Sequence, residues 1–234
     1  MECFFKIKKG YLVKKLLLTG FEAYASTSIN PAEQVAKALD NKVIANMKII
    51  STVVPNTFYK SIEHVKNIMA SQQFDYVLMM GEYQGRSMIT FERFAHNLMD
   101  SSRYQLKDND GVSYDQKEVI SGGPIAYQSH LPLKAMVESV RKAGVPANIS
   151  DTAGTFVCNH LYYGILHETA VNKLPIKVGW AHLPMLPSTA ALVENLGQPS
   201  MCVQTATQGI TAAIKAIAHY PKDIKQSICA GLQI

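Results

Sequence analysis

The chain has no long hydrophobic run and little excess charge. No apolar segment reaches the roughly 18 to 20 residues that span a bilayer, and the N-terminus lacks the continuous apolar stretch of a secretory signal. The net charge is +5, of which residues 1–15 supply +4 through five lysines and Glu2. Because the remaining sequence is nearly neutral, we expect no nucleic-acid partner and no membrane association.

Cysteine is also scarce. Cys3, Cys158, Cys202 and Cys229 lie far apart in the sequence, and no two of them form a C-x-x-C pair. This spacing excludes a dense disulfide framework and a cysteine-rich zinc site. We therefore expect reduced thiols, a cytoplasmic setting and neither a metal nor another cofactor.

Internal repeats and low-complexity tracts are absent, and 234 residues with 47% hydrophobic content suit one α/β domain. Short apolar runs that end in glycine predict buried strands at 14–20 and 75–81. Further strands are expected at 43–54, 147–150 and 176–182, helices at 31–39, 59–69, 132–143, 158–171 and 200–217, and a long surface loop at 101–124. This alternation predicts a three-layer fold with a largely parallel sheet. The first of these helices should begin with Pro31 in its first turn and Asn30 as its cap.

The segment 151–167 (DTAGTFVCNHLYYGILH) carries a candidate nucleophile. A glycine-bearing turn leads into a predicted helix that begins near Cys158. Backbone N–H groups at the start of a helix stabilise a thiolate and can also bind an oxyanion. A free cysteine can equally be a small buried hydrophobic residue, so the alternative for Cys158 is simple packing. The other three cysteines lack such a setting, and we expect them to be structural.

A cysteine nucleophile needs a base, and His182 has the best position among the histidines. It ends a predicted strand and should project at the rim of the sheet, where the reactive groups of α/β proteins gather. His160 and His167 share the predicted helix of Cys158 but lie about 10 Å apart along its axis, too far to bind one metal ion. We expect packing or surface roles for both.

Glu92 is a candidate for the group that orients the histidine. It lies in an apolar, β-like stretch, ITFER (89–93), where an unpaired carboxylate would be costly. The alternative is a salt bridge to Arg93 or to a distant lysine, and the residues alone leave both possibilities open.

Several long motifs occur together in one order. They are TGFEAYASTSINP (19–31), MGEYQGRSMITFERFAHNLMD (80–100), TAGTFVCNHLYYGILH (152–167) and GWAHLPMLP (179–187). From about Lys15 to Ile217 this series resembles the pyroglutamyl peptidase I (pyrrolidone carboxylate peptidase) family of cysteine peptidases. The fold implied by the resemblance is a single three-layer α/β/α sandwich with a mixed, largely parallel twisted sheet. Residues 1–14 would then be a basic N-terminal extension to a peptidase domain at 15–234.

The resemblance implies removal of N-terminal pyroglutamate (5-oxoproline) from peptides through a thioester intermediate, with no cofactor. Its triad falls on Cys158, His182 and Glu92, with the oxyanion bound by the Cys158 N–H and donors of the 81–86 turn. The substrate slot implied by the family pattern is lined by Phe21, Tyr24, Glu82, Phe156 and Val157. The family usually forms tetramers, so we expect a homo-oligomer, either a tetramer or a dimer.

Departures from the family pattern leave alternatives open. Glu82 stands where the family usually has glutamine, and Ser102 replaces an arginine. A carboxylate close to the thiol and the loss of a cation would both raise the pKa of Cys158. The alternatives are therefore a related cysteine amidohydrolase with another N-blocked substrate, or a weakly active or non-catalytic member of the fold. A nucleoside phosphorylase would need a phosphate site, for which the sequence has no cluster of glycine and arginine.

Overall fold

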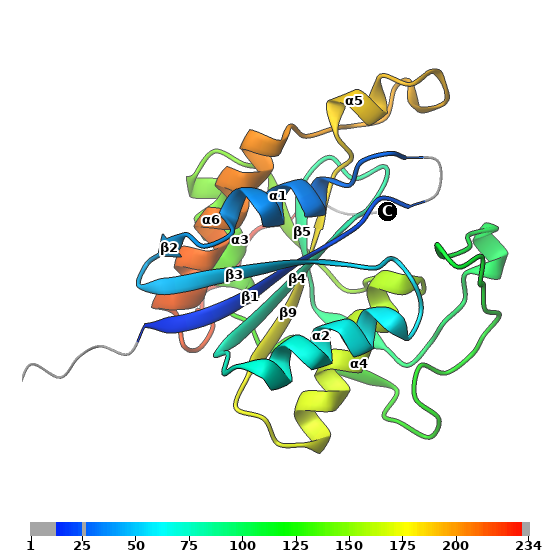
Figure 1. Ribbon diagram of the computed structural model, residues 1–234. Helices are drawn as coiled ribbons and strands as arrows, with labels where there is room; N and C mark the ends of the chain where they lie inside the picture. The colour runs from blue at the N-terminus through cyan, green and yellow to red at the C-terminus, as the bar shows by residue number, and fades with distance from the viewer. Residues whose placement is uncertain (1–12, 25–26, 231–234) are drawn as a thin grey trace, which may run out of the picture.

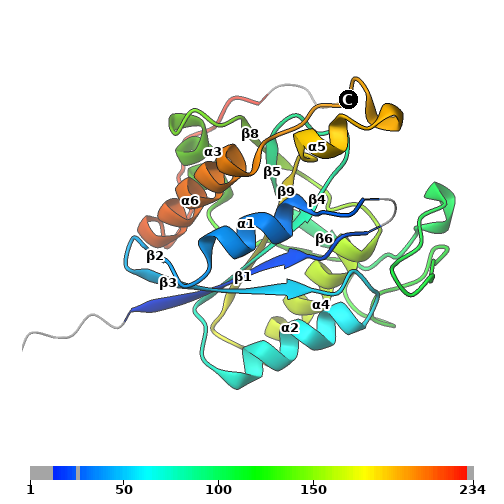
Figure 2. The same ribbon diagram turned by 45° about the horizontal axis from the view of Figure 1, so that its top comes forward.

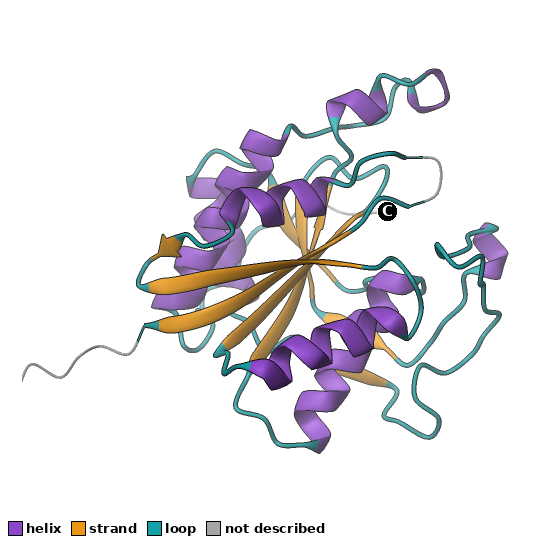
Figure 3. Cartoon of the chain, in the orientation of Figure 1, coloured by secondary structure: helices purple, strands orange, loops and turns teal. Residues whose placement is uncertain are grey.

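The computed structural model describes residues 13–24 and 27–230. Within these residues the main sheet, whose strands are orange in Figure 3, has seven strands in the order β2-β3-β1-β4-β9-β5-β8. The strands are β1 (Lys14–Phe21), β2 (Val43–Ile44), β3 (Met47–Val54), β4 (Tyr76–Glu82), β5 (Ile89–Glu92), β8 (Ala147–Ser150) and β9 (Lys177–Leu183).

The strand directions make the sheet mixed but largely parallel. Parallel pairs join β1 to β3, β1 to β4, β4 to β9, and β5 to β8. Two pairs are antiparallel, β2 with β3 at one edge and β5 with β9 near the other. The antiparallel β5–β9 pair positions two residues of the candidate site.

Helices cover both faces of this sheet, which makes three layers (Figures 1 and 2). One face packs against α1 (Pro31–Leu39), α3 (Leu133–Lys142) and α6 (Val203–His219), and the other against α2 (Lys60–Ser71) and α4 (Val157–Val171). The expected α/β/α sandwich is thus confirmed. None of the helices in the described ranges is both long and apolar enough to cross a bilayer.

The central strand β1 shows why the apolar runs form buried strands. Successive side chains of a strand point to opposite faces, so Leu16 and Leu18 enter the core under α1, α3 and α6. Leu17 and Phe21 enter the core on the α2 and α4 side. A strand with both faces covered by helices is expected to be apolar along its length. From Leu16 onward β1 follows this rule, with Thr19 and Gly20 as the exceptions.

The start of α1 follows the predicted capping pattern. The side chain of Asn30 accepts a hydrogen bond of 2.9 Å from the backbone N–H of Ala32, and Pro31 occupies the first turn. Gly20 permits the close packing of this helix on β1, because a Cβ there would lie 2.2 Å from the carbonyl oxygen of Ala32.

Several elements differ from the sequence-based expectation. The expected strand 43–54 is a hairpin of β2 and β3, because Ala45 and Asn46 adopt positive φ angles of 47° and 61° and turn the chain. Short elements that were not expected are β6 (Phe94–His96), β7 (Ala126–Gln128), α5 (Pro187–Ala190), η1 (Ser102–Tyr104) and η2 (Val193–Asn195). The segment 101–124 is otherwise the expected long loop.

Candidate active site

The antiparallel pairing of β5 with β9 brings His182 and Glu92 together. In this register His182 lies opposite Thr90, and Glu92 lies opposite Trp180. Because side chains two residues apart share a face of a sheet, His182 and Glu92 are diagonal neighbours on one face. The distance from Nδ1 of His182 to Oε1 of Glu92 is 2.8 Å. The Nδ1–H tautomer therefore donates to the carboxylate and leaves a lone pair on Nε2.

Glu92 is fully buried and is held from three sides. Its Oε1 atom accepts a hydrogen bond of 2.6 Å from Nη1 of Arg86 and one of 3.1 Å from the hydroxyl of Thr90, in addition to the bond from His182. Arg86 also bonds to the hydroxyls of Thr90 and Ser150. This network fixes both the carboxylate and the imidazole ring, as an orienting group must.

Cys158 lies in the first turn of α4, as expected. The residue before this helix, Phe156, has no side chain that could cap the free N–H groups. The sulfur atom lies directly over β4, since a Cβ added to Gly81 would be 2.9 Å from Sγ of Cys158 and 3.5 Å from Cδ2 of His182. Gly81 therefore leaves the space that thiol and imidazole share.

Burial and charge set the protonation states of the three residues. Burial raises the pKa of the Cys158 thiol above its ordinary value; the negative charges of Glu92 and Glu82 add to this, and Arg86 opposes it. Burial also lowers the pKa of His182, although Glu92 opposes the shift. Burial alone would raise the pKa of Glu92, but the hydrogen bond and charge of His182 and the charge of Arg86 hold that pKa below its usual range. These shifts disfavour the charged thiolate and imidazolium and favour the carboxylate form of Glu92.

A cavity of about 380 Å³ opens over Cys158 and His182. Of the residues predicted to line a substrate slot, Tyr24, Glu82 and Phe156 line this cavity. Phe21 and Val157 do not, because both are buried in the core on the α2 and α4 side. The wall is otherwise made by Tyr83, Gln84, Tyr104, Leu106, Ala153, Gly154, Thr155 and Asn195.

Arg86 has a role in the site that the sequence did not predict. We expected only oxyanion donors from the 81–86 turn, yet the guanidinium pairs with Glu92 and also stacks over the ring of Tyr83, 4.0 Å from its centroid. Tyr83 in turn packs edge-on against the His182 ring at 5.2 Å. The available signal was a lone arginine between two apolar strands, in a region that also contains a buried carboxylate.

Neither Ser102, the other departure from the family pattern, nor the adjacent Arg103 lines the cavity that contains Cys158. Ser102 is exposed in η1 and does not line the cavity. Arg103 pairs with Asp100 and stacks on Tyr104. The lost cation is therefore replaced by neither residue.

Other histidines and cysteines lie outside this cavity. His160 is buried, with its ring packed edge-on against Phe58 and Tyr59 at 5.2 Å and 4.9 Å, in the packing role that we expected. Cys202 and Cys229, in contrast, are exposed rather than packed. Cys3 lies outside the described residues.

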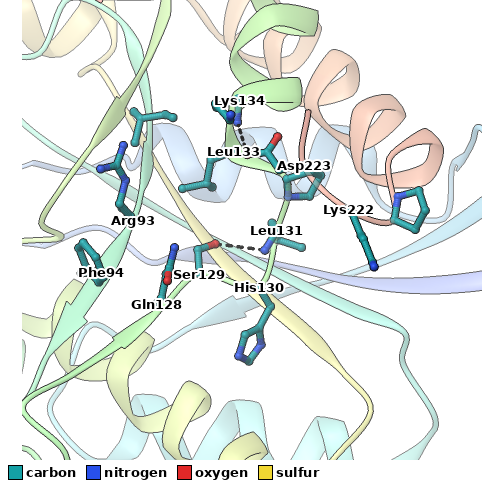
Figure 4. A pocket seen from close by; sticks show the side chains of 13 residues that line it. Arg93, Phe94, Gln128, Ser129, His130, Leu131, Leu133, Lys134, Lys222 and Asp223 are labelled. Atoms are coloured by element: carbon teal, nitrogen blue, oxygen red, sulfur yellow. Dashed lines mark hydrogen bonds between the residues drawn. The ribbon is translucent and has the colours of Figure 1, made fainter. Parts of the chain in front are cut away.

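A second cavity, of about 640 Å³, lies at the start of α3 (Figure 4). Its lining includes the basic side chains of Arg93, Lys134 and Lys222, together with His130 and Asp223. Asp223 accepts hydrogen bonds from the backbone N–H groups of Lys134 and Ala135. Arg93 pairs with Asp151 and not with Glu92. None of the predicted site residues lines this cavity, and no group of three His, Cys, Asp or Glu in the described parts of the chain could hold a metal ion.

Comparison with known proteins gives concordant matches. The family model described as pyroglutamyl peptidase matches residues 14–220. The pyrrolidone-carboxylate peptidase of Mycobacterium tuberculosis is 50% identical over 222 residues, which are 95% of this chain and 100% of that protein. The pyrrolidone-carboxylate peptidase of Bacillus mycoides is 43% identical over 212 residues, which are 91% of this chain and 96% of that protein.

Solved structures agree in fold. The crystal structure of pyroglutamyl peptidase I from Bacillus amyloliquefaciens superimposes with a TM-score of 0.86 at 36% identity and covers 90% of this chain and 100% of that one. Pyrrolidone carboxyl peptidase from Thermococcus litoralis gives a TM-score of 0.86 at 33% identity, with 92% and 100% covered.

Proposed function

Because the chain belongs to the pyroglutamyl peptidase family, we propose that it is a cysteine peptidase that removes N-terminal pyroglutamate from peptides. The observation that carries the proposal is the meeting of a helix-start thiol and a carboxylate-oriented imidazole in one cavity. The peptide substrate enters that cavity with its lactam ring first. No cofactor takes part in the proposed reaction.

We propose a reaction in which these residues act in turn. Nε2 of His182 takes the proton of Cys158 as the sulfur attacks the carbonyl carbon between the lactam residue and the next amide nitrogen. The C–N bond then breaks, and the imidazolium gives its proton to the leaving amine. Water attacks the resulting thioester, His182 accepts the water proton, and pyroglutamate and the free thiol are released.

The directions of the pKa shifts favour a narrower assignment of the roles. Since the pKa of Cys158 is raised and that of His182 is lowered by burial, the proton moves from sulfur to nitrogen only during the attack. His182 is then a general base and acid rather than half of a permanent ion pair. Glu92 stabilises the imidazolium that forms, and Arg86 keeps Glu92 ionised.

The oxyanion of the tetrahedral intermediate needs hydrogen-bond donors. The N–H groups in the first turn of α4, including that of Cys158, have no side-chain cap, and we propose that they bind this oxyanion. We expect the backbone of the 81–86 turn to supply a second donor.

Hydrolysis of a chromogenic 5-oxoprolyl amide, measured beside its prolyl counterpart, tests this function. The wild type should cleave the 5-oxoprolyl compound, Cys158→Ala should not, and Cys202→Ala should behave as the wild type because Cys202 is exposed and remote from the cavity. Full activity after complete alkylation of Cys158, located by mass mapping, would refute the mechanism.

The setting and assembly are part of the same proposal. A reduced catalytic thiol suits the cytoplasm, and residues 15–234 would form the peptidase domain. We propose a homo-oligomer, tetramer or dimer, because the segment after α5 exposes the apolar side chains of Leu192, Val193 and Leu196, with 43%, 84% and 68% of each accessible. Light scattering of the wild type and of Val193→Asp would test this: a monomeric wild type would contradict it.

A further inference from the structure

Glu82 is a buried carboxyl group without a hydrogen-bond partner, and it lines the same cavity as Cys158 and His182. The residue ends β4 and is 5% exposed, yet neither carboxyl oxygen is bonded within the described part of the chain. Glu92, the other carboxylate of the site, has three partners on Oε1 and lacks one only on Oε2, whereas both oxygens of Glu82 lack a partner. A buried polar group in a cavity that lacks a partner is expected to find one in a ligand.

No lysine or arginine of the described chain lines this cavity with Glu82. The lining includes Tyr24 from the loop after β1, Cys158 from α4, His182 from β9 and Gln84 beyond the end of β4. Burial raises the pKa of Glu82 to about 7. The nearby Gln84 side chain acts in the opposite direction and offsets only part of this rise. The pKa of Tyr24 is raised by burial, then by Glu82 and Cys158, so its hydroxyl stays neutral.

The lactam ring of pyroglutamate presents an N–H donor and a C=O acceptor on adjacent atoms. A carboxylic acid presents an O–H donor and a C=O acceptor with matching spacing, so the two groups can exchange two hydrogen bonds. A carboxylate has acceptors only, and its charge would face the lactam carbonyl oxygen. It would instead attract a ring that carries a protonated secondary amine.

We infer that Glu82 is a specificity-determining residue whose carboxylic acid form selects the neutral lactam ring and whose carboxylate form selects a cationic pyrrolidine ring. The inference rests on the proposed function, since it assigns the lactam to this cavity. A glutamine at this position has a donor and an acceptor at every pH, so Glu82→Gln should bind the lactam without this dependence.

Two small competitors test the inference, because neither has a scissile bond and neither titrates between pH 6 and 8.5. 2-Pyrrolidone is a neutral lactam, and pyrrolidine is a cation. If only the acid form binds the lactam, the inhibition constant of 2-pyrrolidone rises about 30-fold between pH 6 and pH 8.5. The inhibition constant of pyrrolidine should fall over the same range. This opposite trend is measurable on the wild type alone.

Glu82→Gln should flatten both trends. Glu194→Gln, which removes an exposed carboxylate beside the cavity residue Asn195, should leave them unchanged. A 2-pyrrolidone constant that is independent of pH in the wild type, or equal slopes in the wild type and Glu82→Gln, would overturn the inference. Cleavage of the 5-oxoprolyl amide at pH 6 separates the two proposals. If the enzyme cleaves it but the inhibition constants do not change with pH, only the role of Glu82 is refuted. If the enzyme does not cleave it, the proposed function itself is refuted.

Discussion

At the residue scale, the network around Glu92 separates chemistry from orientation. His182→Ala removes the proton carrier and should lower kcat by about 10³- to 10⁴-fold. Glu92→Gln keeps the proton carrier but loses its orienting carboxylate, so the loss should be smaller. Steady-state kinetics with the 5-oxoprolyl amide measure both. His167→Ala is the control, since this residue bonds to Tyr127; a larger loss in that variant would refute the assignment of the base.

Charges near the sulfur should also change the rate at which Cys158 is alkylated. At pH 8, Glu82→Gln should speed alkylation of Cys158 by iodoacetamide about threefold, because the negative charge of Glu82 raises the pKa of the thiol. Arg86→Gln should slow alkylation by a similar factor, since Arg86 lowers that pKa. Ser102→Arg should have no effect, because residue 102 is exposed in η1. Identical rates in all four proteins would exclude an electrostatic role for Glu82 and Arg86.

At the element scale, the contact between β4 and α4 positions the thiol. Gly81→Ala would place a Cβ 2.9 Å from Sγ of Cys158 and 3.1 Å from the Trp180 ring, so the sulfur must shift. Because displacement of a reacting group by about 1 Å lowers rates by about 10²-fold, kcat/KM should fall by that order. The thermal midpoint shows whether the fold survives. A variant with normal kinetics would mean that the thiol has room to relocate.

A second element-scale prediction concerns the start of α3. Asp223 accepts hydrogen bonds from the backbone N–H groups of Lys134 and Ala135. It lies beyond the region that the family model matches. Asp223→Ala should therefore lower the free energy of unfolding by about 1 kcal/mol, the usual value of a helix cap. Urea denaturation measures this change, with the exposed Asp115→Ala as the control. Equal losses in the two variants would show that Asp223 does not act as a cap.

At the scale of the whole molecule, buried His160 should make stability depend on pH. Burial lowers the pKa of His160 to about 3. Between pH 6.5 and pH 3 the unfolded state binds a proton that the folded state does not, so stability falls as the pH falls. Relative to His160→Gln, the wild type should lose about 2 kcal/mol of unfolding free energy between pH 6.5 and pH 5. Parallel curves for the two proteins would contradict this, and the exposed His219→Gln should follow the wild type.

The sequence by itself determined the elements and the type of fold. Apolar runs that end in glycine, and a proline after a capping asparagine, are local signals, and they correctly predicted β1, β4 and α1. The hairpin of β2 and β3 was missed because its turn uses Ala45 and Asn46 in a conformation that is more typical of glycine. Cys158 could be singled out for the same local reason, since the start of a helix is visible in the sequence.

Only the tertiary structure decided how the candidate site is assembled. His182 and Glu92 are ninety residues apart in sequence, and their contact depends on β5 running antiparallel to β9, which no local pattern specifies. The pairing of Arg86 with Glu92 and the missing partner of Glu82 depend likewise on which groups the fold places around each charge. Composition and motifs determine which residues are available, whereas burial and strand pairing determine which of them meet and in which protonation state.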